Sequence, residues 1–92
     1  MRIMLASKIE GMITGKNLHY SGSITIGRDL MADTNLIPFE QVHVLNKSNG
    51  ERFITYALEG KGREIILNGA AARLGEVGDE VIILSYEICW GG

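Results

Sequence analysis

The chain has 92 residues, 46% hydrophobic and 22% charged, with a formal net charge of −2. This length predicts one small domain over residues 1–92, which buries little surface alone and is therefore expected to oligomerise. The absence of a basic block argues against nucleic acid as a partner. No apolar run approaches the roughly 18 residues of a membrane span, and the single cysteine fits a cytoplasmic protein.

Alternating hydrophobic residues predict β-strands along most of the chain. The N-terminal residues 2–14 predict an opening strand or a bent strand pair rather than a signal peptide. Further strands are expected over residues 23–28, 42–46, 52–58, 63–68 and 79–88. Turns rich in glycine and asparagine separate these segments.

Two segments predict short helices. Residues 29–36 begin with Asp29 as an acidic cap and end before Pro38, and residues 68–75 contain three alanines and end at a glycine. Many short strands with two brief helices predict a mainly β protein, folded as a small β-barrel.

The stretch "HYSGSITIG" places Gly22 and Ser23 where a strand is expected to begin. Such a step is usually a turn. No G-x-S-x-G motif surrounds Ser23, so an ordinary hydrolase is not supported. An unhindered glycine carbonyl beside a hydroxyl suits another reaction, in which Ser23 attacks Gly22 and turns the amide into an ester. Elimination and hydrolysis would then leave a pyruvoyl ketone, which can form a Schiff base with an amine.

Five blocks carry a resemblance to a known family: "MLASKI", "NLHYSGSITI", "NGERFITYAL", "IILNGAAA" and "VGDEVIILSY". In this order and spacing the chain resembles the pyruvoyl-dependent aspartate decarboxylases, which make β-alanine for pantothenate biosynthesis. The resemblance implies a double-psi β-barrel with two short helices. It also implies a homotetramer with active sites between neighbouring subunits.

The resemblance also implies which residues form the site. Cleavage between Gly22 and Ser23 would give chains 1–22 and 23–92, with Ser23 converted to the pyruvoyl group. Tyr56 matches the proton donor, and Thr55 and Tyr20 match residues that assist cleavage. The residues matched to substrate binding are Lys8, Arg52, Thr55, Asn68, Gly69, Ala70 and Ala71. Some members of the family have an acid where this chain has Ser21. The family also usually continues past "ICWGG", and we expect that C-terminal segment to affect assembly more than chemistry.

These residue types suit decarboxylation of L-aspartate. A ketone-derived imine is an electron sink, so neither pyridoxal phosphate nor a metal is expected. Arg52 can hold a carboxylate with two parallel hydrogen bonds, and Lys8 adds a point charge. We expect both cations to hold the retained β-carboxylate while the α-carboxylate faces a drier surface. The turn at Asn68 offers free N–H groups and small side chains to a carboxylate.

Strand alternation leaves one question open. Arg52 and Tyr56 should share one face of their strand, and Thr55 should lie on the other. Either the strand twists or bulges there, or Thr55 serves the cleavage site of a neighbouring subunit.

Three other functions compete with this hypothesis. A pyruvoyl decarboxylase could act on another acidic amino acid such as glutamate, and a non-catalytic oligomeric barrel could serve as an interaction module. An oligonucleotide-binding barrel is disfavoured by the acidic balance and the aromatic content of 7%. His19 and His43 have no acidic or cysteine partner at ligand spacing, so no metal site is expected, and His43 is assigned to a strand surface.

Overall fold

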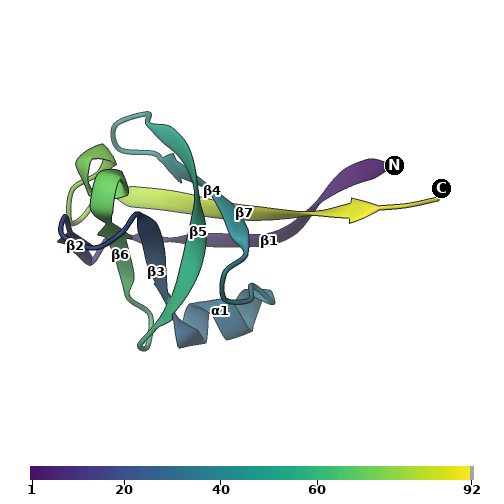
Figure 1. Ribbon diagram of the computed structural model, residues 1–92, viewed down its shortest axis with the longest axis horizontal. Helices are drawn as coiled ribbons and strands as arrows, with labels where there is room; N and C mark the ends of the chain where they lie inside the picture. The colour runs from purple at the N-terminus through teal and green to yellow at the C-terminus, as the bar shows by residue number, and fades with distance from the viewer. Residues whose placement is uncertain (92) are drawn as a thin grey trace.

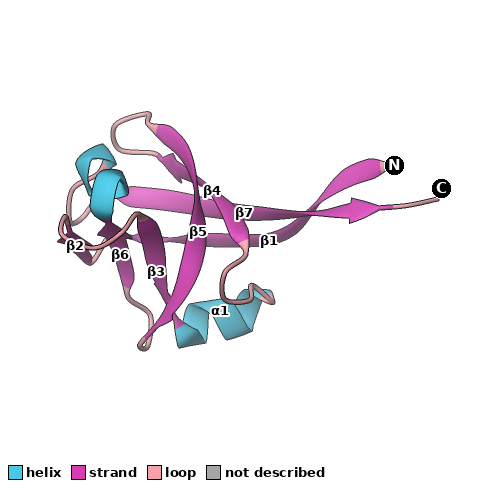
Figure 2. Cartoon of the chain, in the orientation of Figure 1, coloured by secondary structure: helices cyan, strands magenta, loops and turns pink. Residues whose placement is uncertain are grey.

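A computed structural model describes residues 1–91 as a mainly β protein with two short helices, as predicted (Figures 1 and 2). In chain order the elements are β1 (Arg2–Met12), β2 (Gly15–Asn17), β3 (Ser23–Gly27), α1 (Arg28–Thr34), β4 (Gln41–Asn46), β5 (Arg52–Gly60), β6 (Ile65–Asn68), the 3₁₀ helix η1 (Gly69–Leu74) and β7 (Glu80–Cys89). Neither helix in this part of the chain has the length and apolar character that a membrane crossing requires.

The seven strands form one sheet in the order β1-β7-β4-β5-β3-β6-β2. The two ends of this order, β1 and β2, are consecutive in the chain and separated by two residues. The sheet must therefore curl until its ends meet, and Thr14 donates a backbone hydrogen bond of 2.8 Å to Ile65 at that junction. This arrangement is the one that the predicted barrel requires. Its double-psi crossing stays a prediction.

A two-stranded ribbon projects from the body of the sheet. The pairing of β4 with β7 covers only Val81–Leu84, whereas β1 follows β7 as far as Cys89. The outer part of β1 and β7 therefore runs beyond the sheet, and both termini lie at the end of this ribbon (Figure 1). The molecule measures 42 × 26 × 22 Å as a result.

Alternation gives the sheet two distinct faces. The inward face carries the buried core residues Ile9, Val81, Ile83, Val42, Val44 and Ala57. The cross-strand pairs define two rows on the outward face: Glu10, Ile82, Leu45 and Arg52 in one, and Lys8, Leu84, His43 and Ile54 in the next. Inward residues make the core, and outward residues are free for binding or assembly.

The structure corrects several predictions. Strand β2 was not predicted, because three residues are too few for a periodic signal. Helix α1 begins at Arg28 after Gly27, with no side-chain cap, so Asp29 lies within the first turn instead of capping the helix. His43 is half-buried rather than a surface residue, because its ring packs edge-on against Tyr86 with centroids 5.0 Å apart.

Candidate active site

The Gly22–Ser23 step lies at the start of β3. Ser23 is fully buried, and its hydroxyl donates to the Ser21 carbonyl at 3.4 Å. Gly22 is exposed, and a Cβ built on it would meet nothing within 4 Å. The structure therefore combines a serine hydroxyl held by hydrogen bonds with open space at the Cα of the preceding glycine.

The side chain of Asn68 holds this hydroxyl. Asn68 is the last residue of β6 and is paired with Ser23 across the two antiparallel strands. Its amide nitrogen donates to Ser23 Oγ and to Thr25 Oγ1, both at 2.9 Å. Because the amide has two N–H groups, each oxygen receives one. Sequence reasoning missed Thr25, although an oxygen two positions beyond Ser23 on the same strand face could have indicated it.

Gly69 lets the cleavage segment pass close to the turn that follows β6. Its φ is +60°, a conformation that L side chains rarely adopt. A Cβ at this position would lie 2.5 Å from the Tyr20 carbonyl oxygen and 2.7 Å from the Gly22 nitrogen. Gly69 thus supports the backbone of Tyr20 and Gly22 directly. The Tyr20 side chain is half-exposed.

A hollow of about 280 Å³ opens beside Gly22. Strands β3 and β5 pair only from Ile24↔Ala57 onward. Residues 52–56 of β5 therefore have no β3 partner, and their edge on that side is open. The hollow is lined by Gly22, Phe53, Ile54, Thr55, Ala70, Ala71 and Leu74. The structure therefore brings together four residues assigned from sequence: the glycine of the predicted cleavage, Thr55 and the two alanines.

Thr55 lies beside Gly22 of its own chain. The pairing of β4 with β5 runs without a register shift from Arg52 to Tyr56, so the predicted alternation holds and β5 has no bulge there. Ile24 of β3 pairs with Ala57 of β5, and these two strands are parallel. Ser23 and Tyr56, which directly precede this pair, therefore lie opposite each other on neighbouring strands. Tyr56 remains 38% exposed.

The two predicted cations do not line this hollow. Lys8 and Arg52 both lie on the outward face, on strands three positions apart in the sheet. At about 4.8 Å per strand, the two strands are about 14 Å apart across the sheet, and Lys8 also lies one row further along. Lys8 forms an ion pair with Glu10, with Nζ 3.5 Å from Oε1. Neither cation lines the hollow of its own chain, although Arg52 directly precedes the lining residue Phe53.

The turn that opens η1 differs from the helix start that we expected. The segment is a 3₁₀ helix of six residues, and Gly75 after it has an extended φ of −165° instead of a left-handed one. Such a short helix has few aligned peptides, so the helix dipole offers little to a carboxylate. The small side chains of Ala70 and Ala71 remain the relevant property, because they leave the hollow open.

An asparagine–aspartate pair holds the far end of η1. Buried Asn46 donates its amide to Asp79 Oδ2 at 2.9 Å and to the Leu74 carbonyl at 3.3 Å. The Asn46 amide lowers the pKa of Asp79 from its ordinary value of 3.8, helped by the Glu76 N–H at 2.8 Å. The Asn46–Asp79 pair thus connects the end of β4, the end of η1 and the start of β7.

Comparison with known proteins identifies the family. The sequence model described as "Aspartate decarboxylase" matches residues 1–90. The chain belongs to the aspartate decarboxylase family. Two aspartate 1-decarboxylases, from Pyrobaculum islandicum and Thermoanaerobacter pseudethanolicus, are each 52% identical to it over 95% of the chain, which spans 73% and 77% of their lengths. For the enzyme from Persephonella marina the identity is 51%, over 92% of the chain and 63% of the relative. The resemblance noted from sequence is confirmed.

Proposed function

We propose that this aspartate decarboxylase family member cleaves itself between Gly22 and Ser23 and then converts L-aspartate to β-alanine and CO₂, the step that supplies β-alanine for pantothenate synthesis. Family membership supports the reaction, because the matched relatives bear the name aspartate 1-decarboxylase. The observation that carries the proposal is the buried Ser23 hydroxyl, held by Asn68 next to an open Gly22.

Self-cleavage begins with attack of Ser23 Oγ on the Gly22 carbonyl carbon. The C–N bond breaks as the C–O bond forms, so the amide becomes an ester and the Ser23 nitrogen takes up a proton. Loss of the Ser23 α-proton expels the Gly22 carboxylate, and water then replaces the nitrogen as ammonia. Thr55, which borders the same hollow as Gly22, is suitably located to donate a hydrogen bond to the oxygen that becomes negative during attack.

The residues around Ser23 fit the ketone that this sequence of steps creates. One N–H of the Asn68 amide would donate to the oxygen at position 23, and the second N–H would continue to donate to Thr25 Oγ1. The hollow beside Gly22 has room for a small substrate, and its alanines do not obstruct it. A pyruvoyl group supplies a carbonyl that captures the substrate amine and withdraws electrons from the bond to the leaving carboxylate.

Lys8 and Arg52 would bind the carboxylate that aspartate retains. Both lie on the outward face, and neither lines the hollow of its own chain. A second copy of the chain, with its outward face against the hollow, would bring the cations to the substrate. This geometry supports active sites between subunits of the homotetramer that the family resemblance implies, and a cytoplasmic location fits the lone cysteine.

Tyr56 would return the proton after CO₂ departs. It stands level with Ser23 on the neighbouring strand, and its partial exposure leaves the hydroxyl able to reach a substrate. A proton donor positioned in this way contributes on the order of 10² to 10⁴ in rate.

Denaturing mass spectrometry tests the proposal most directly. The purified chain, after warming, should give fragments 1–22 and 23–92, the larger with a blocked N-terminus. Ser23→Ala should stay intact and inactive while remaining folded, because Asn68 keeps its bond to Thr25. A wild-type chain that stays uncut and inactive would favour a non-catalytic module. Faster turnover of glutamate than of aspartate would refute the choice of substrate.

A further inference from the structure

Lys8 does not stand alone on the outward face. Glu10 follows it by two residues on β1, so alternation places both side chains on the same side of the strand. Their charged atoms are 3.5 Å apart, and the side chains remain 51% and 65% exposed. Any carboxylate that binds Lys8 from solvent must therefore share its ammonium group with Glu10.

Arg52 has no such partner. It stands in the same outward row as Glu10, separated by Ile82 and Leu45. Among residues 1–91, no carboxylate lies within ion-pair distance of its guanidinium. The two cations assigned to the substrate therefore differ, since Lys8 is already paired and Arg52 is open.

We propose that Glu10 is a positioning residue that competes with the substrate for Lys8 and so lowers the affinity of the site for dicarboxylates. The inference rests on the proposed function, in which Lys8 binds the retained carboxylate of aspartate. Glu10 pairs with the ammonium on the face that receives substrate, so an arriving carboxylate has to share Lys8 with it.

The expected size of the effect follows from the exposure of the pair. Exposed ion pairs contribute at most about 1 kcal/mol, so removal of the Glu10 charge should tighten dicarboxylate binding by up to about fivefold, and a twofold gain is the smallest that supports the inference. The change belongs to binding and not to chemistry, because Glu10 contacts Lys8 rather than Ser23 or Tyr56. It should therefore lower KM and leave kcat nearly unchanged.

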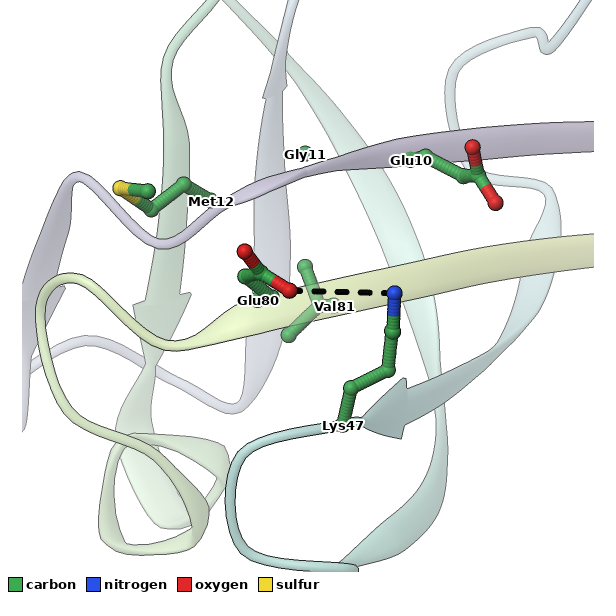
Figure 3. Close-up of a pocket in the computed structure, with 6 residues that line it drawn as sticks. All are labelled: Glu10, Gly11, Met12, Lys47, Glu80 and Val81. Atoms are coloured by element: carbon green, nitrogen blue, oxygen red, sulfur yellow. Dashed lines mark ion pairs between the residues drawn. The ribbon is translucent and has the colours of Figure 1, made fainter.

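The same face offers a matched control. Glu80 on β7 and Glu10 on β1 border one surface hollow of about 340 Å³, and Glu80 pairs with Lys47 at 3.7 Å (Figure 3). Glu80 is 62% exposed, nearly as much as Glu10, but its partner has no assigned role in substrate binding. Glu80→Gln changes the net charge by the same amount without freeing Lys8.

Succinate, a dicarboxylate without an amine, is the probe. Its Kd is measured by calorimetry on the uncleaved Ser23→Ala chain, alone, combined with Glu10→Gln, Glu80→Gln or Lys8→Gln, and combined with Glu10→Gln and Lys8→Gln together. Glu10→Gln should lower the Kd two- to fivefold, Glu80→Gln should not, and the gain should vanish in the Lys8→Gln background. In the processed enzyme, Glu10→Gln should lower KM for aspartate by a similar factor.

Each other outcome overturns the inference. An unchanged Kd, an equal gain from Glu80→Gln, or a gain that survives Lys8→Gln would show that Glu10 does not act through Lys8. Succinate that binds neither chain would do the same. Because the Ser23→Ala chain needs no cleavage, these results remain distinct from failure of the proposed function, which would appear as an uncut or inactive wild-type chain.

Discussion

Gly69 is the residue whose substitution should disturb the cleavage segment most directly. Gly69→Ala would force a side chain into a left-handed backbone and against the Tyr20 carbonyl and the Gly22 nitrogen. We expect a loss of about 1–3 kcal/mol in the free energy of unfolding, together with slower cleavage. Urea denaturation and the rate of fragment appearance measure the two effects.

Gly62→Ala is the matched control. Gly62 has a similar φ of +55°, but a Cβ there would meet nothing within 4 Å. It should share the backbone strain and leave cleavage unaffected. If both variants cleave at the wild-type rate, the close packing of Gly69 under Gly22 has no part in processing.

Substitution of Tyr56 tests self-cleavage and turnover separately. Tyr56→Phe keeps the aromatic ring and removes the hydroxyl, so the variant should cleave normally. It should lower kcat by on the order of 10²-fold or more, with a smaller change in KM. Mass spectrometry of the fragments measures cleavage, and steady-state CO₂ release measures kcat and KM. Wild-type turnover by this variant would exclude Tyr56 as the proton donor.

At the scale of elements, the Asn46–Asp79 pair connects β4, η1 and β7. The pKa of Asp79 is lowered in the folded chain, chiefly by the Asn46 amide. Its contribution to stability is therefore present above the ordinary value of 3.8 and is lost as pH falls through the lower folded pKa. Asp79→Asn should be less stable than wild type at pH 7, and the difference should shrink in acid. Urea denaturation at several pH values measures this, and a difference that is constant with pH would contradict it.

At the scale of the whole molecule, neither Lys8 nor Arg52 lines the hollow beside Gly22 of its own chain. If active sites lie between copies, two inactive variants should complement each other. Co-expressed Ser23→Ala and Arg52→Ala chains should recover part of the wild-type activity, because one supplies the guanidinium and the other the ketone. Light scattering should give a tetramer. No recovery in a verified mixed assembly would place both groups in the same chain.

The sequence by itself determined every strand except β2, the two short helices and the family. The alternation of hydrophobic residues along stretches such as 42–46 and 82–84 indicates a strand with one buried face, and it is a local property of the sequence. Five blocks in a fixed order carried the family resemblance. It also separated Thr55 from Arg52 and Tyr56 correctly, because the period of a regular strand is fixed.

The tertiary structure alone decided which residues meet. The contacts of Asn68 with Thr25, and of Gly69 with Tyr20, join segments more than forty residues apart in the chain. Strand order and register set such contacts, and no local pattern encodes them. For the same reason only the fold shows that Glu10 and Arg52 share a row, and that β5 leaves an edge open beside Gly22.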